Sequence, residues 1–132
     1  MERIERILQR INFKSDGLVP VATQDEKTGQ VLMLAYMNRE ALERTLSTGK
    51  MHYFRRAVGR LWCKGEESGK FQYVKAVRVN CYADSLLFLV DQVDAACHEG
   101  YFSCYFREFD EEGNLHVIAE RIFDPDEVYK KK

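Results

Sequence analysis

From residue 50 onward, the sequence is a succession of short segments rich in β-branched and aromatic residues. Six of them follow one another, and Gly, Asp or Asn separates most of them: MHYFRR, RLWCKG, YVKAVRVNCY, SLLFLVDQV, YFSCYFREF and LHVIAERIF. β-branched and aromatic residues are enriched in strands, and Gly, Asp and Asn are typical of the turns that join strands. Because the segments arrive without helices between them, they favour an α+β fold with a mixed, largely antiparallel sheet over alternating βαβ units.

Helical patterns are confined to the first third of the chain. The apolar residues of the opening segment recur at the spacing of one helix face: Ile4, Ile7, Leu8 and Ile11. A second helix is predicted over REALERTLST, because Asn38 before it can accept a hydrogen bond from a free amide of the first turn. Gly49 after it suits the left-handed conformation in which many helices end. We therefore expect two helices near the N-terminus.

Length and composition bound the rest of the architecture. A chain of 132 residues fits one domain that buries roughly two thirds of its unfolded surface without cross-links. LVPVATQD and VLMLAYM flank EKTG, which predicts a hairpin ahead of the second helix. The chain contains no internal repeat, low-complexity segment or linker. We expect residues 1–132 to form a single α+β domain whose sheet is barrel-like.

Charge and hydropathy exclude several classes of partner. Hydrophobic residues make up 45% of the chain and charged residues 31%, with 20 basic against 21 acidic side chains. This balance argues against disorder and against a general polyanion binder, so nucleic acid is not an expected partner. The sequence has no run of eighteen apolar residues, and Glu2 and Glu5 lie where a signal peptide needs basic and then apolar residues. We expect a cytoplasmic protein with no membrane partner.

Four cysteines in a reducing cytosol are more often free, metal-binding or catalytic than paired in disulfides. Cys97 and Cys104 lie seven residues apart in ACHEGYFSC, and Cys81 precedes Cys97 by sixteen. A structural zinc site usually has two close pairs, whereas a catalytic zinc takes three protein ligands and leaves a position open for water. The spacing therefore fits an open zinc site. By itself the spacing also allows unrelated cysteines buried as small hydrophobic residues, or redox chemistry.

Three motifs together carry a resemblance to a known family. LMLAYMNREAL, RLWCKGEESGKFQ and the set of Cys81 with ACHEGYFSC occur in the order and with the separations seen in phosphoribosyl-AMP cyclohydrolase. This enzyme acts in the third step of histidine biosynthesis, and the resemblance covers about residues 17 to 107. It implies a zinc-dependent hydrolase that opens the adenine ring of 1-(5-phosphoribosyl)-AMP between N1 and C6. It also implies one zinc per subunit in an intertwined homodimer, bound by Cys81 of one subunit and by Cys97 and Cys104 of the other.

The resemblance and the chemistry of the reaction suggest roles for further residues. His98 lies beside a predicted ligand and has an ordinary pKa of about 6.5, so it is the candidate catalytic acid–base group, although a lone histidine is often structural. Cys63 matches a variable position and is expected to be structural. The candidates for substrate binding lie in or near the KGEESGK segment, which by itself is also typical of a solvated polar hairpin. They are Arg56, Trp62, Lys64, Gly65, Glu66, Ser68 and Gly69.

The sequence departs from the family pattern in two places. Where the family has three aspartates around the first zinc cysteine, this chain has Asn80, Tyr82 and Asp84, so Asn80 and Asp84 form a degenerate magnesium site. Where the family has an S-R-S-R segment, residues 55–58 of this chain read RRAV, and only Arg56 matches. Two alternatives therefore stay open: a paralogue that hydrolyses a related purine or heterocyclic nucleotide, and a non-catalytic dimer linked by zinc.

Overall fold

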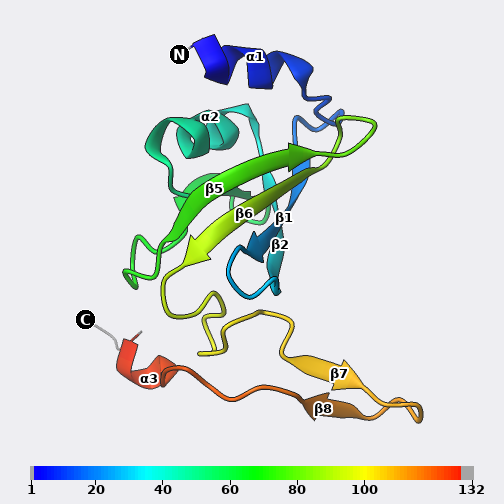
Figure 1. Ribbon diagram of the computed structural model, residues 1–132, viewed down its shortest axis with the longest axis vertical. Helices are drawn as coiled ribbons and strands as arrows, with labels where there is room; N and C mark the ends of the chain where they lie inside the picture. Colours follow the sequence, from blue (N-terminus) through cyan, green and yellow to red (C-terminus); the bar gives the residue numbers. More distant parts are fainter. Residues whose placement is uncertain (1, 129–132) are drawn as a thin grey trace.

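A four-stranded sheet in the order β2-β1-β6-β5 is the largest element of the computed structural model, which describes residues 2–128 (Figure 1). Its strands are β1 (Val19–Asp25), β2 (Val31–Met37), β5 (Gln72–Val79) and β6 (Leu86–Gln92). β1 pairs antiparallel with β2 and parallel with β6, and β5 pairs antiparallel with β6. The sheet is therefore mixed and largely antiparallel, as the sequence predicted.

The expected barrel-like closure is wrong, because no closed barrel forms among the described strands. The remaining four strands form two separate hairpins, β3 (His52–Arg55) with β4 (Arg60–Cys63) and β7 (Arg107–Phe109) with β8 (Leu115–Val117). These strands are only three or four residues long and pair only within their own hairpins. They therefore do not connect β2 to β5, and the four-stranded sheet stays open.

Both expected N-terminal helices are present, and a short third helix follows near the end of the described chain. They are α1 (Glu2–Arg10), α2 (Arg39–Thr48) and α3 (Pro125–Val128). The ends of α2 form as the sequence predicted. The Asn38 side chain accepts a hydrogen bond from the amide of Ala41 at 2.8 Å, and Gly49 adopts a φ of 77°. No helix in residues 2–128 is long and apolar enough to cross a membrane.

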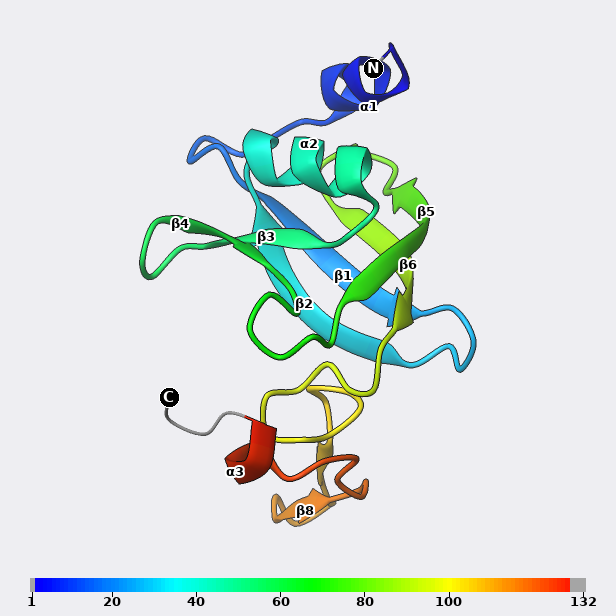
Figure 2. The ribbon, with the colours of Figure 1, turned by 90° about the vertical axis from the view of Figure 1, so that its left-hand side faces the viewer.

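The hydrophobic core lies between the two N-terminal helices and the sheet (Figure 2). In both β1 and β6, buried residues alternate with half-buried ones, as expected for central strands with one face on the core. The largest fully buried apolar side chains come from every part of this layer: Leu8, Leu32, Met37, Leu42, Met51 and Phe88. This packing holds the β3–β4 hairpin close to the sheet, since Met51 and Tyr53 belong to the same cluster.

A buried polar network crosses the core at the same level. The Tyr53 hydroxyl donates to Gln72 Oε1 at 2.7 Å and lies 2.7 Å from Thr23 Oγ1. The Gln72 amide donates to Gln92 Oε1 at 2.8 Å. Burial raises the pKa of Tyr53 above its ordinary value, and the hydrogen bond to Thr23 opposes that shift. The network joins β1, β3, β5 and β6, so it fixes the hairpin that carries Trp62 relative to the sheet.

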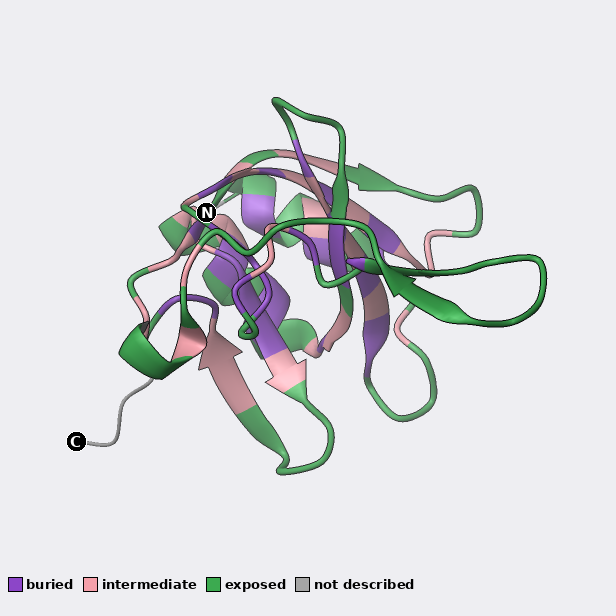
Figure 3. Cartoon of the chain, turned by 90° about the horizontal axis from the view of Figure 1, so that it is seen from below, coloured by how far each residue is buried: buried purple, intermediate pink, exposed green. Residues whose placement is uncertain are grey.

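The chain beyond β6 forms a separate lobe past one end of the sheet (Figures 1 and 2). It is attached to β2, because the Cys104 amide donates to the Leu32 carbonyl at 2.8 Å and the Ser103 hydroxyl to the Val31 carbonyl at 2.6 Å. Seen from the lobe's side, the β7–β8 hairpin projects outward and is exposed along its length (Figure 3). The two predicted strands of this region are therefore much shorter than the sequence suggested.

Candidate active site

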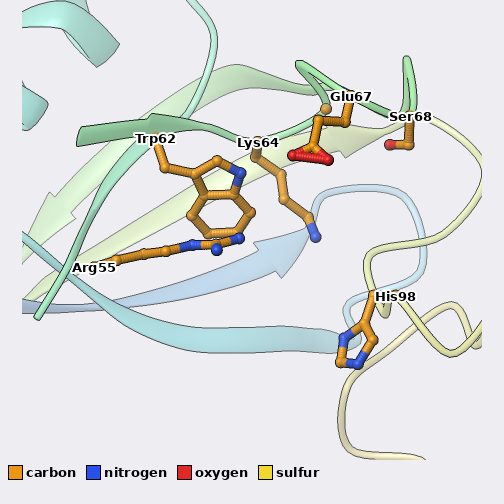
Figure 4. A pocket seen from close by; sticks show the side chains of 7 residues that line it. Arg55, Trp62, Lys64, Glu67, Ser68 and His98 are labelled. Carbon is orange, nitrogen blue, oxygen red and sulfur yellow. The ribbon is translucent and has the colours of Figure 1, made fainter. Parts of the chain in front are cut away.

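Two segments that lie about thirty residues apart in the sequence meet in a pocket of about 150 Å³ (Figure 4). One is the segment that ends β4 and continues into KGEESG, and the other is the loop with His98. The Lys64 ammonium donates to the carbonyl of Ala96, which connects the two segments directly. The pocket is lined by Arg55, Trp62, Lys64, Gly65, Glu67, Ser68 and His98. Four of the predicted substrate-binding residues and the predicted catalytic histidine are thus brought together.

The register of the β3–β4 hairpin determines which side chains reach this pocket. Tyr53 pairs with Trp62 and Arg55 with Arg60, so these four residues point to one face of the hairpin. Arg55 stacks its guanidinium 4.3 Å from the centre of the Trp62 ring. Sequence analysis missed Arg55 as a site residue. The two-residue alternation of HYFR could have identified it, because that alternation puts Arg55 on the face of Tyr53.

Lys64 is a buried cation next to two thiols. Its side chain is only 9% exposed, and no carboxylate of a described residue lies within ion-pair distance of it. Burial lowers the pKa of Lys64, while the neighbouring Cys104 and Cys97 oppose this shift. The structure therefore places the ammonium where it faces the predicted zinc ligands. A lysine that bound a substrate phosphate from solution would instead have an exposed ammonium group.

Cys97 and Cys104 lie side by side in the lobe, and their side chains interact. Partial desolvation of the thiol raises the pKa of Cys104 to about 11; Cys97 adds to this shift and Lys64 opposes it. Cys97 is buried, and its sulfur accepts a hydrogen bond from the Glu99 amide at 3.4 Å. Two adjacent thiols are a donor set that fits zinc, since thiolates are preferred ligands of this metal.

Cys81 lies elsewhere, exposed in the turn between β5 and β6. The seven residues of β6 separate this turn from the lobe, and such a strand spans about 20 Å. Figure 1 shows the turn and the lobe beyond opposite ends of the sheet. Among residues 2–128, no group of three or more His, Cys, Asp or Glu residues is placed to hold a metal ion. One chain thus brings together two of the three predicted ligands and leaves the third accessible to another chain.

Asn80 and Asp84 close the turn on either side of Cys81. The Asn80 side-chain oxygen accepts hydrogen bonds from the amides of Asp84 at 2.9 Å and Ser85 at 3.0 Å, and its amide donates to Asp84 Oδ1 at 2.6 Å. The other Asp84 oxygen lies 4.0 Å from the Lys14 ammonium. Magnesium takes oxygen ligands in an octahedral array, and it often keeps several waters and uses one or two carboxylates plus substrate phosphates. The Asn80 oxygen and one Asp84 oxygen already take part in hydrogen bonds that close the turn, so binding of magnesium by Asn80 and Asp84 stays a prediction of a weakened site.

The other predicted substrate-binding residues lie around the pocket. Arg56 stacks 4.0 Å from the Tyr36 ring centre in an adjoining hollow of about 540 Å³, which shares Arg55 and Trp62 with the pocket. Glu66 accepts a hydrogen bond from the Cys63 amide at 3.1 Å and faces a different hollow. Glu67, which the sequence did not single out, lines the pocket. Gly69 donates its amide to the Gly65 carbonyl at 2.7 Å and closes the loop.

Gly65 is required by the geometry of this loop. Its φ is +98°, a region that side chains other than glycine rarely adopt. A Cβ at this position would lie 2.7 Å from the backbone nitrogen of Phe71. Because no flexible side chain can move aside there, the KGEESG loop depends on glycine to bring its backbone close to β5.

Known proteins have sequences similar to the segments that form this site. The family model for phosphoribosyl-AMP cyclohydrolase matches residues 33–106, which include the pocket and the three predicted zinc ligands. The phosphoribosyl-AMP cyclohydrolase of Nitratidesulfovibrio vulgaris is 53% identical over 118 residues, covering 89% of this chain and 93% of the relative. That of Methanospirillum hungatei is 54% identical over 121 residues, covering 92% and 89%.

A longer relative extends the comparison. The histidine biosynthesis bifunctional protein HisIE of Thermoanaerobacter pseudethanolicus is 48% identical over 128 residues. The match covers 96% of this chain but 58% of that relative, so the present chain corresponds to one part of the bifunctional protein. With the family model and several relatives near 50% identity over most of their length, the chain belongs to the phosphoribosyl-AMP cyclohydrolase family.

Proposed function

We propose that this protein is a phosphoribosyl-AMP cyclohydrolase of histidine biosynthesis, a zinc-dependent hydrolase that opens the adenine ring of 1-(5-phosphoribosyl)-AMP between N1 and C6. Family membership supports the reaction class. The observation that carries the proposal is the meeting of the Lys64 and His98 segments in one pocket beside the Cys97–Cys104 thiol pair. A biosynthetic enzyme of this kind is expected in the cytoplasm.

Zinc would be held by Cys97 and Cys104 of one chain and Cys81 of a second copy, because the exposed Cys81 lies far from its own chain's thiol pair. A bound zinc lowers the pKa of a water ligand from about 16 toward 7. Three thiolate ligands donate more charge than three imidazoles would, so a nearby base is valuable. His98 is exposed, lines the pocket and follows a ligand directly, so it would take the proton of the attacking water and return it to the departing ring nitrogen.

Substrate binding would use both hollows on the Trp62 face of the hairpin. The substrate carries two phosphate groups, and two arginines face this surface: Arg55 lines both hollows, and Arg56 lines the adjoining one. Ser68 and the backbone around Gly65 offer further donors to a phosphate. Lys64 would hold the His98 loop against this surface through its bond to Ala96.

An assay of phosphoribosyl-AMP hydrolysis by the purified protein tests the proposal. We expect turnover on the order of 1–10³ per second, loss of activity on zinc removal and recovery on zinc addition, with a reduced requirement for magnesium. His98→Ala should keep zinc but lower turnover by roughly 10²–10⁴, and added imidazole should restore part of it. Unchanged turnover with reduced zinc would instead make His98 a ligand. Zinc binding without any turnover would favour the non-catalytic dimer.

A second candidate is a paralogue that acts on a related purine nucleotide. It is favoured by one observation, the turn in which Asn80 and Asp84 satisfy each other in place of the family's free carboxylates. The Asn80→Asp, Tyr82→Asp double variant separates the two candidates. It should leave phosphoribosyl-AMP turnover equal or higher in the histidine-pathway enzyme. In a paralogue it should lower activity on the true substrate, because two negative charges are added near a group that Asn80 and Tyr82 now accommodate.

A further inference from the structure

The chain returns from the β7–β8 hairpin to the loop that carries His98 just before α3 begins (Figure 2). The Gly100 carbonyl accepts hydrogen bonds there from the amides of Ile122 at 2.6 Å and Phe123 at 3.4 Å. We call residues 121–123 the C-terminal strap. They lie outside the segment that the family model matches, so the motifs of the reaction do not account for this contact.

The strap meets the tight turn on which His98 lies. The Gly100 amide donates to the Cys97 carbonyl at 3.0 Å, so these two residues close a four-residue turn with His98 as its second residue. The strap approaches this turn so closely that a Cβ at Gly100 would collide with the Phe123 carbonyl. The position of the turn, and with it that of the His98 ring, therefore depends on where the strap lies.

Lys70, the last residue of KGEESGK, contacts both the strap and the start of the His98 loop. Its ammonium lies 4.7 Å from the centre of the Phe123 ring and 2.9 Å from Asp94 Oδ2. The Lys70 side chain is only 13% exposed, and a cation withdrawn from water interacts more strongly with a ring or a carboxylate than an exposed one does. We therefore expect these contacts to hold more firmly than those of an exposed surface lysine.

The backbone of Asp94 gives a second reason for this anchor. Asp94 follows β6 by two residues and precedes His98 by four, so it sets the direction in which the loop leaves the sheet. Its φ is 56°, a conformation that residues other than glycine adopt rarely and keep only where the surrounding structure imposes it. The ion pair with Lys70 is a contact that imposes it.

The His98 turn is thus tied to KGEESGK at both of its ends. Before the turn, the Ala96 carbonyl accepts the hydrogen bond from Lys64. After it, Gly100 is bonded to the strap, which Lys70 contacts in turn. A turn fixed at both ends has less conformational freedom than one fixed at a single end, so it presents its side chain to the pocket in fewer orientations.

We propose that Lys70 is a positioning residue for catalysis: through Phe123 and Asp94 it holds the C-terminal strap against Gly100, and the strap fixes the turn that presents His98 to the pocket. Lys70 does not line the pocket itself, so it acts through His98 and not on the substrate. The inference rests on the proposed function in one respect, the acid–base role of His98. A base must lie within about 3 Å of the proton that it takes, and a misplacement of about 1 Å can cost roughly 10²-fold in rate.

Steady-state kinetics of phosphoribosyl-AMP hydrolysis test the proposal in two variants. Lys70→Met removes the cation, and Phe123→Ala removes the ring but keeps both backbone hydrogen bonds to Gly100. We expect kcat to fall by roughly 5–50-fold in each variant, which is within the cost of a misplaced base. KM should stay within about threefold of wild type, because the arginines that would bind phosphate belong to the β3–β4 hairpin.

Conservative variants and a matched control accompany this test. Lys70→Arg keeps the cation and Phe123→Tyr keeps the ring, so both should retain at least about half of the wild-type kcat. Lys75→Met removes an exposed lysine that forms no ion pair with any residue in the described part of the chain, and it should behave like wild type. Wild-type kcat in either Lys70→Met or Phe123→Ala would overturn the inference.

A double-mutant cycle with His98→Ala separates positioning from a general loss of structure. If Lys70 acts through His98, Lys70→Met should change kcat by less than about twofold once the histidine is gone, because coupled effects are not additive. A further loss as large as that in the wild-type background would overturn the inference. Zinc content should stay at the wild-type level. A fall in kcat that follows loss of zinc would also overturn it, because the strap would then support the cysteine ligands and not His98.

Hydrogen exchange of backbone amides gives a readout that does not depend on activity. Peptides that cover residues 97–104 should exchange faster in Lys70→Met and Phe123→Ala than in wild type, while those of β1 and β6 should be unchanged and verify that the variants are folded. If the wild-type protein had no turnover, faster exchange would show that the strap fixes the turn, and only the proposed function would fail. Normal wild-type turnover with unchanged exchange in both variants would overturn the strap and leave the proposed function standing.

Discussion

Removing the hydroxyl group of Tyr53 tests whether the buried polar network stabilises the fold. In Tyr53→Phe the ring stays, so its packing 5.6 Å from the Trp62 ring centre is retained. Gln72 Oε1 loses a hydrogen bond of 2.7 Å, and Thr23 loses its partner at 2.7 Å. All three side chains are almost completely buried, so water does not replace the lost bonds.

The size of the effect follows from the two groups left behind. A buried polar group without a partner costs about 1–3 kcal/mol, and Thr23 can relax more easily than the amide of Gln72, which is also bonded to Gln92. We expect the free energy of unfolding to fall by about 2–3 kcal/mol, which corresponds to a melting temperature lower by roughly 10 °C for a domain of this size. Turnover at permissive temperature should change little, because Trp62 keeps its packing.

Thermal and urea unfolding at one fixed protein concentration measure the change, since a dimer unfolds in a concentration-dependent way. Tyr73→Phe is the matched control. Its residue is more than one third exposed, and its hydroxyl has no hydrogen bond to any residue that the structure describes, so the expected loss is below about 0.5 kcal/mol. If Tyr53→Phe lost no more stability than Tyr73→Phe, the network would not be a stabilising feature of the fold.

Three further outcomes are expected. Lys64→Met should lower kcat/KM by roughly 10–100-fold in steady-state assays, because a charge-assisted hydrogen bond that connects the two segments of the pocket is lost; a change below twofold would contradict this role. Gly100→Ala should destabilise more than Gly113→Ala in thermal melts, because both have positive φ but only at Gly100 would a Cβ collide with the Phe123 carbonyl. Hydrogen bonds hold the pKa of Asp110 below its ordinary value of 3.8; the one with His116 has the largest effect, and the one from the Asn114 amide the next largest. The stabilisation is therefore present above that pH and is lost as the pH falls through the lowered pKa, so melts between pH 2.5 and 6 should show an acid-dependent loss that Asp110→Asn reduces.

The structure confirms the sequence predictions that depend only on residues close together in the chain, such as helix ends and tight turns. Asn38 and Gly49 bound α2 through hydrogen bonds inside five residues of chain, and the EKTG turn joins two strands that pair directly. The strands predicted around YFSCYFREF and LHVIAERIF are mostly wrong. Their residue types suit strands, but only Arg107–Phe109 and Leu115–Val117 find a partner, and strands exist only where two segments pair.

The sequence by itself determined the local elements and the residues that carry the chemistry, because caps, turns and motif spacing are properties of short stretches. Only the tertiary structure decided how these residues are grouped. The parallel pairing of β1 with β6 and the antiparallel return of β5 put Cys81 and the Cys97–Cys104 pair beyond opposite ends of one sheet. The same packing brought the Lys64 ammonium to the carbonyl of Ala96, beside the His98 loop. Such contacts join segments tens of residues apart, so their free energies depend on the whole packed core and leave no local pattern in the sequence.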